Sequence, residues 1–147
     1  MFSVKGLRVG MSVAVLAITG LSSGLVSLAS ASATTAPKLV VTPSTNIHNG
    51  ESLKVTGSGF KPGDSVYVVE CLVSAKGAAG CKISGAIPAT ISATGRLPKT
   101  TIKVTTGKIG NGKCGTKTSN LRNCAISAGN AAGGDSAVAR IIFRAVK

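Results

Sequence analysis

The sequence has few of the side chains on which most enzymes and nucleic-acid readers depend. It contains no Trp, one Tyr, three Phe, one His and four acidic residues among 147. A single His without an evident acidic partner argues against a Ser–His–Asp hydrolase, and we interpret His48 as an exposed turn residue. The shortage of aromatic rings argues against selective binding of single-stranded nucleic acid, whose bases stack on such rings. Composition therefore argues against both of these classes.

The N-terminal part has the features of a secretory signal. A basic start is followed by an apolar stretch at residues 11–21 and by the small-residue cleavage site Ala-Ser-Ala at 31–33. We expect cleavage to make residues 1–33 the signal and 34–147 the mature, extracellular domain. The alternative is an uncleaved membrane anchor, but polar residues interrupt the apolar stretch before the ~20 residues that a span needs. We predict no membrane span after cleavage.

All four cysteines lie in the predicted exported domain. An even number of cysteines in a small exported domain favours disulfides over a metal site. Nine residues separate Cys71 from Cys81 and nine separate Cys114 from Cys124, unlike the close pairs of zinc or redox motifs. Three connectivities are open. We predict the local pairs Cys71–Cys81 and Cys114–Cys124, because each closes one short loop between strand candidates.

The strongest strand signal begins at Ser65 and leads to Cys71 and a Gly- and Ala-rich loop at residues 74–80. Its residues are largely β-branched, aromatic or apolar, as in a pleated, half-buried strand. Alternation places two sets on opposite faces: Tyr67, Val69, Cys71 and Val73 on one, and Val66, Val68, Glu70 and Leu72 on the other. Because both faces are largely apolar, we predict a central strand that is covered on both sides.

The rest of the domain also has the pattern of short strands separated by turns. Further strand candidates are 38–42, 52–58, 82–92 around Pro88, 100–105, 123–128 and 137–146, whereas 107–123 is predicted to be a long loop. Six to eight short strands with regular turn signals indicate an all-β sandwich or barrel.

Glu70 is an acidic residue on an apolar strand face. If it is buried it needs a partner, because an unpaired buried carboxylate is costly. Lys103 and Arg140 are the candidates. We favour an ion pair with one of them over a contact with a ligand, since buried charges are usually paired.

Four segments of the predicted domain form a recognisable ordered set: KLVVTPST, ESLKVTGSGFKPGDSVYVVEC, ISATGRLPKTTIKVT and NCAISAGNAAGGDSAVARIIF. In their order and sequence they resemble the neocarzinostatin family of secreted actinomycete apoproteins. The resemblance implies a seven-stranded immunoglobulin-like Greek-key sandwich with two short-loop disulfides. It also implies a cleft that holds an enediyne chromophore non-covalently, in a protein that carries and protects the compound without being an enzyme.

The resemblance places the Cys71–Cys81 bridge at the floor of this cleft, with Tyr67, Val69 and Val73 facing the ligand. Ile109 is the only large apolar residue of the later loop. Chromophore-binding members have an aromatic residue at the position of Val73 and favour a small residue at that of Val69. The branched valine side chains occupy space that glycine would leave empty, so we predict a shallow groove. Ring stacking contributes roughly 0.5–1.5 kcal/mol per pair, so its loss here predicts weak binding of flat polycyclic compounds.

Charge supplies the second hypothesis. The chain has 17 Lys and Arg against four acidic residues, a formal net charge of +13. Basic residues concentrate at Lys108, Lys113, Lys117 and Arg122. Such a surface serves solubility or attracts polyanions such as DNA or cell-envelope polymers. Two functions therefore stay open: an antibiotic-type chromophore carrier, and a secreted basic sandwich without a chromophore that binds anionic polymers or a protein partner at the envelope.

Overall fold

A computed structural model describes residues 35–145 of the chain. The predicted export signal, residues 1–33, lies outside the described residues, and its cleavage remains a prediction. Among the residues that are described, no helix has the length and apolar character needed to cross a membrane.

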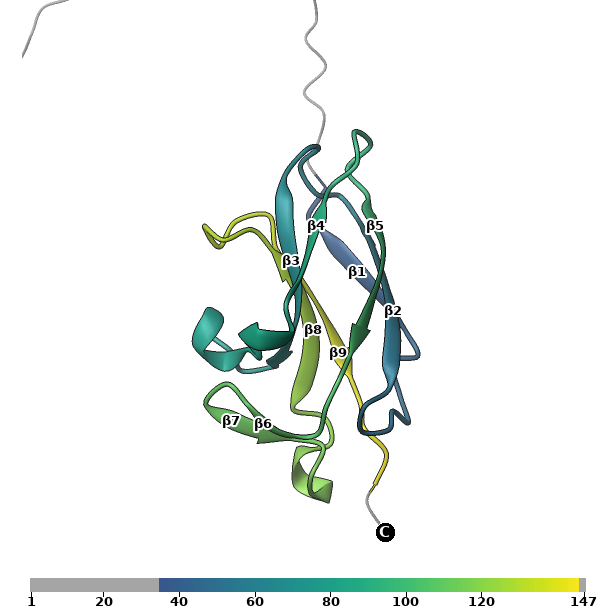
Figure 1. The fold of residues 1–147 in the computed structure, drawn as a ribbon, viewed down its shortest axis with the longest axis vertical. Coiled ribbons are helices and arrows are strands. Elements are labelled where there is room, and N and C mark those ends of the chain that lie inside the picture. The colour runs from purple at the N-terminus through teal and green to yellow at the C-terminus, as the bar shows by residue number, and fades with distance from the viewer. Residues whose placement is uncertain (1–34, 146–147) are drawn as a thin grey trace, which may run out of the picture. The chain divides into compact units, whose positions relative to one another are not determined.

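The described chain is an all-β sandwich (Figure 1). Its strands are β1 (Lys38–Thr42), β2 (Ser52–Ser58), β3 (Ser65–Leu72), β4 (Ile87–Thr90), β5 (Leu97–Lys103), β6 (Gly107–Ile109), β7 (Gly112–Cys114), β8 (Cys124–Gly129) and β9 (Ala137–Ile141). One sheet has the order β1-β2-β5 and the other β4-β3-β8-β9, while β6 and β7 form a separate hairpin. All these strand pairs are antiparallel. The seven strands of the two main sheets confirm the predicted immunoglobulin-like Greek-key architecture.

Strand β3 is central, as predicted, because it pairs with β4 on one side and with β8 on the other. Its inner face contributes Val66, Val68 and Leu72 to the hydrophobic core. The core is completed by apolar side chains of both sheets, among them Leu53, Val55, Ile102, Ile126 and Ile141, each at most 1% exposed. Alternation along β3 therefore assigns its two faces correctly.

One open side of the sandwich is closed by the segment between β1 and β2. The amide of Ile142 donates to the carbonyl of Ser44 at 2.9 Å, and the amide of Arg144 donates to the carbonyl of Ile47 at 3.0 Å. The chain after Ile141 thus leaves β8 and pairs with this segment instead. For this reason β9 ends at Ile141, earlier than the predicted 137–146.

The predicted loop 107–123 contains the β6–β7 hairpin, so the prediction of a long loop is wrong. A two-residue turn, Gly110–Asn111, joins the strands, and Gly110 has a φ of 52°, which glycine adopts readily. The amide of Asn111 donates to the carbonyl of Ala79 at 3.1 Å. A Cβ on Gly112 would come within 2.6 Å of the Leu72 side chain. Close backbone approach thus seats the hairpin against the end of β3 and the loop that follows it.

Both predicted disulfides are confirmed. Cys71 and Cys81 are joined across an isolated antiparallel bridge, with Cα atoms 3.9 Å apart. Cys114 and Cys124 are fully buried in the core and link β7 to β8. A disulfide that closes a short loop stabilises a small domain by about 2–4 kcal/mol, mainly through the unfolded state. Here the bridges also attach both loops to the four-stranded sheet.

Glu70 is the only buried charged residue of the described chain, at 2% exposure. Its Oε2 accepts a hydrogen bond from the amide of Thr105 at 3.0 Å, and its Oε1 has no partner. The ammonium of Lys82 donates to the Thr105 hydroxyl at 2.8 Å. The predicted ion pair with Lys103 or Arg140 is wrong, because both of these side chains are exposed on the outward faces of β5 and β9.

Burial raises the pKa of Glu70 from 4.5 to about 7, against the opposing effects of its bond from Thr105 and of the Lys82 charge. Between these values the folded state holds a proton that the unfolded state has released, so this group makes the domain less stable as pH rises from 4.5 to 7. The shift corresponds to about 3 kcal/mol. Glu70→Gln should remove this contribution and raise the free energy of unfolding above neutral pH by up to that amount.

Urea unfolding followed by circular dichroism across this pH range tests the effect of Glu70. The stability difference between Glu70→Gln and wild type should grow from acidic to neutral pH. Glu51→Gln is the matched control, and it should follow the wild-type curve because Glu70 is intact. A Glu70→Gln difference that stays constant with pH would contradict the assignment.

Candidate functional site

The outer face of the four-stranded sheet carries a small apolar layer of its own. On β3, Val69 is 8% and Cys71 3% exposed, and on β8 Ala125 is fully buried, yet none of the three belongs to the hydrophobic core. Cys71 is paired with Ala125, which in turn is paired with Arg140 of β9. Paired residues of neighbouring strands share a face. We call Val69, Cys71 and Ala125 the outer-face layer.

Two large apolar side chains next to this layer reach solvent. Tyr67, two residues before Val69 on β3, is 47% exposed, and Val138 of β9 is 61% exposed. Val138 is paired with Ser127, which is paired with Val69. Apolar side chains of the outer face therefore also reach solvent, on both sides of β8.

The loop after β3 forms a fixed wall beside the outer-face layer. Its start is held by the amide of Val73, which donates to the carbonyl of Asn123 at 2.8 Å, and its end by the amide of Lys82, which donates to the carbonyl of Glu70 at 2.8 Å. The Cys71–Cys81 bridge joins the two ends. Figure 1 shows that this loop and the β6–β7 hairpin project on the same side of the sandwich.

A cavity of about 300 Å³ opens where β3 ends. It is lined by Val73, Ser74, Arg122, Asn123 and Arg140. This volume is at the lower limit of small-molecule sites, which measure roughly 300–1,000 Å³. We call it the Val73 cavity. The Val73 cavity lies beside the outer-face layer, and we treat the cavity and the layer together as the candidate functional site.

The residues predicted to line a cleft are only partly brought together. Tyr67, Val69, Cys71 and Val73 lie along one face of β3 and its continuation, and Cys81 is half-buried in the attached loop. Ile109 is instead fully buried in the hydrophobic core. Its predicted place on the cleft wall is contradicted, because the hairpin directs Ile109 inward and its exposed neighbour Lys108 outward.

Neither of the two charged residues of the candidate site is assigned to a ligand cleft by the sequence. The pattern predicts Arg122 only in a polyanion-binding surface, and Arg140 only as a partner of Glu70. Alternation along β9 does indicate that Arg140 points outward, and this signal could have identified it as a surface residue of this sheet. Its place beside Ala125, however, depends on strand register, which the sequence pattern does not reveal.

The predicted polyanion-binding residues are all exposed. Lys108 and Lys113 stand directly opposite each other on β6 and β7. Lys117 precedes the short 3-10 turn η3 (Thr118–Asn120), and Arg122 follows it. Within residues 35–145 one ion pair is formed, Lys61 with Asp64 at 4.0 Å. None of the four predicted residues is therefore paired with a carboxylate in the described chain.

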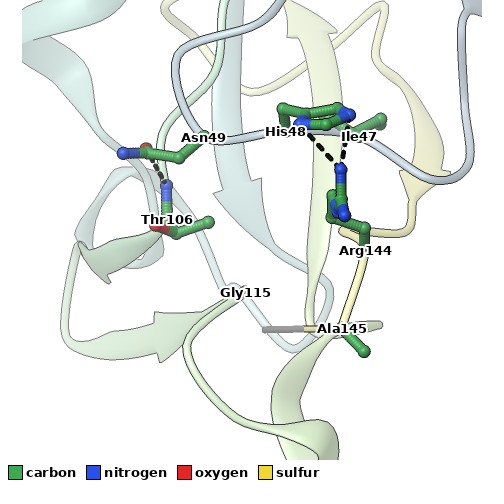
Figure 2. A pocket seen from close by; sticks show the side chains of 7 residues that line it. All are labelled: Ile47, His48, Asn49, Thr106, Gly115, Arg144 and Ala145. Carbon is green, nitrogen blue, oxygen red and sulfur yellow. Dashed lines mark hydrogen bonds between the residues drawn. The ribbon is translucent and has the colours of Figure 1, made fainter. Parts of the chain in front are cut away.

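A second cavity, of about 390 Å³, is not predicted by the sequence (Figure 2). It is lined by Ile47, His48, Asn49, Thr106, Gly115, Arg144 and Ala145. The Nη1 atom of Arg144 lies 3.1 Å from Nε2 and 3.3 Å from Nδ1 of His48. On the other side of the opening, the amide of Thr106 donates to Oδ1 of Asn49 at 2.9 Å.

His48 is exposed, as predicted, and its ring is hydrogen-bonded to the guanidinium of Arg144. The nearby carboxylate of Glu51 accepts a hydrogen bond from the His48 backbone amide at 2.7 Å. No carboxylate within the described chain is hydrogen-bonded to the ring. The second cavity thus lacks the carboxylate–imidazole pairing that a Ser–His–Asp mechanism needs.

Comparison with known proteins agrees with this arrangement of sheets and bridges. A model of the Neocarzinostatin family matches residues 39–143. Macromomycin of Streptomyces macromomyceticus is 32% identical over 81 residues, a stretch that covers 55% of this chain but only 56% of macromomycin.

Two solved structures have the same fold. Macromomycin superposes with a TM-score of 0.59 at 26% identity, over 74% of this chain and 100% of that chain. Apokedarcidin gives a TM-score of 0.51 at 23% identity, over 75% and 100% of the two chains, and supports the fold alone. With the family match over most of the described residues, this chain belongs to the neocarzinostatin family.

Proposed function

We propose that this chain is a secreted, non-enzymatic carrier that binds a flat, largely apolar small molecule on the outer face of its four-stranded sheet. The observation that carries the proposal is the outer-face layer: Val69, Cys71 and Ala125 are buried outside the hydrophobic core, next to the Val73 cavity. Concave apolar sites with a few polar groups are the usual binding sites of small molecules.

Family membership supports this choice of function. The resemblance to neocarzinostatin-type apoproteins suggests an enediyne-type chromophore as the class of cargo, held without a covalent bond. Secretion is supported by the two disulfides, which persist in oxidising compartments, and by the signal features of residues 1–33. A carrier requires no catalytic pair, only a surface that excludes water from its ligand.

The fit of a large chromophore is limited by two side chains. Val69 leaves only 8% of its surface exposed, and Val73 lines a cavity of about 300 Å³ in which no aromatic residue takes part. Branched side chains occupy space that glycine would leave open. The proposed carrier therefore has a shallow site that suits a smaller or thinner ligand than a deep cleft would.

The carrier function leads to a prediction for this shallow site. Wild-type protein should bind 9-anthracenemethanol, an uncharged flat fluorophore, weakly. Val69→Gly combined with Val73→Trp should bind it several-fold more tightly, because glycine opens the face and one stacked ring pair adds roughly 0.5–1.5 kcal/mol. Fluorescence titration measures this without interference from Trp in the wild type, which has none.

Val40→Trp is the matched control for that titration. Val40 is 61% exposed on β1, in the other sheet, so an added ring there should leave the affinity unchanged. Equal improvement in both variants would show that any surface tryptophan binds the dye. Tight binding by the wild type would contradict the argument that the two valines limit the site.

A second candidate function is polyanion binding by the β6–β7 hairpin and its surroundings. Lys108 and Lys113 lie directly opposite each other, and like charges in this position repel unless a counter-charge is present. Lys117 and Arg122 add to the same segment, and no acidic residue occurs between Lys108 and Arg122. An anionic polymer would relieve this repulsion.

This second candidate function predicts salt-dependent binding to duplex DNA. Binding should be measurable at low salt and should weaken steeply as salt rises, through counterion release. Lys108→Gln, Lys113→Gln and Lys117→Gln together should reduce the slope of log K against log salt by about 0.9 for each phosphate that the variant no longer neutralises. Fluorescence anisotropy with a labelled duplex provides the slopes.

A triple variant of Lys54, Lys99 and Lys103 to Gln is the matched control, since these exposed residues belong to β2 and β5 of the other sheet. It removes the same charge and should change the slope less. If both triple variants change the slope equally, binding depends on net charge and the hairpin has no particular role.

A further inference from the structure

Two arginines stand together at the Val73 cavity. Arg122 precedes β8 and Arg140 lies on β9, so the two come from separate segments of the chain. Both line the cavity, with Val73 as its apolar side chain and Ser74 and Asn123 as its neutral polar ones. The cavity thus combines two guanidinium groups, hydrogen-bonding side chains and an apolar surface.

No carboxylate of residues 35–145 is paired with these arginines. The chain has four acidic residues, and each is engaged elsewhere. Asp64 pairs with the Lys61 ammonium, and Asp135 accepts from the Lys61 amide. Glu51 accepts from the amide of His48, and Glu70 accepts from the amide of Thr105. Neither Arg122 nor Arg140 forms a side-chain hydrogen bond or ion pair with any other described residue.

The chemistry of guanidinium groups defines what would fit between them. A guanidinium is planar, always charged, and matches the two oxygens of a carboxylate with two parallel hydrogen bonds. Its flat face also stacks on aromatic rings. Arginines can therefore supply the stacking that Val73 cannot, together with a charge that selects the ligand.

We propose that the Val73 cavity is an anion-selective subsite that takes a flat aromatic carboxylate. The carboxylate binds between Arg122 and Arg140, and the aromatic body extends from Val73 over the outer-face layer along the row Arg140–Ala125–Cys71. This inference rests on the proposed carrier function and names the chemical class of the cargo. It gives the positive charge at this place a function other than solubility.

Two probes of the same shape test the inference. Anthracene-9-carboxylate and 9-anthracenemethanol share a ring system and differ in charge. The full secreted protein should bind the carboxylate about ten-fold or more tightly, since a hydrogen-bonded charge pair is stronger than a neutral hydrogen bond. Fluorescence titration gives both affinities, and amide chemical shifts of Val73, Ser74 and Asn123 report where the carboxylate binds.

Arg122→Gln with Arg140→Gln should remove most of this preference, and both residues are exposed, so the fold should tolerate the change. Arg122→Lys with Arg140→Lys keeps the charge without the planar group, and it should retain part of the preference. Lys108→Gln with Lys113→Gln is the matched control, with the same loss of charge on the hairpin, and it should leave the preference intact.

The outcomes separate this inference from the carrier function. Equal affinity for the two probes, or a preference that survives Arg122→Gln with Arg140→Gln, would overturn the subsite while leaving the carrier intact. Failure of both probes to bind would overturn the subsite and count against the carrier. An equal loss of preference in the hairpin control would assign the effect to general surface charge and overturn the subsite.

Discussion

Burial of β3 on both of its faces is the constraint on which the rest of the structure depends. The inner face of this strand, with Val66, Val68 and Leu72, belongs to the core between the two sheets. The outer face buries Val69 and Cys71 outside that core. The strand is also central in its sheet, because it pairs with both β4 and β8. The loop that begins at its end is tied back to the same strand through Cys71–Cys81.

The two disulfides act on opposite faces of this strand's sheet. Cys114 and Cys124 are buried within the core, where their sulfur atoms lie within 4.8 Å of a Glu70 carboxylate oxygen. Cys71–Cys81 instead fixes the wall of the outer face. One bridge thus stabilises the interior near a carboxylate whose pKa is raised by burial, and the other holds the surface on which we place the ligand.

Much of the fold is predictable because strand alternation is a local property. Residues 38–42 and 52–58 are predicted with the bounds that the structure has, since each stretch alternates or is β-branched and ends at Pro or Gly. The β6–β7 hairpin escapes prediction because each of its strands has three residues and Ile109 is the only large apolar one. No alternation can be detected in so short a segment.

The candidate site is less predictable than the fold because it depends on register between distant strands. Arg140 approaches the end of β3 only because β8 pairs with both β3 and β9. The prediction for the partner of Glu70 is wrong for a related reason. One oxygen of its carboxylate accepts from the backbone amide of Thr105, and the sequence identifies side chains but not the positions of backbone donors. Residues on the face of β3 itself, such as Val69, can be assigned to the site from local alternation alone.

The central claim is that ligands bind on the outer face of the four-stranded sheet. Methyl NMR distinguishes the two places: Val73 lines the Val73 cavity and Ala125 belongs to the adjoining outer-face layer, whereas Ile47 and Ala145 line the cavity beside His48. With anthracene-9-carboxylate bound, we expect nuclear Overhauser effects from the ring protons to Val73 and Ala125. Effects to Ile47 and Ala145 in their place would contradict it.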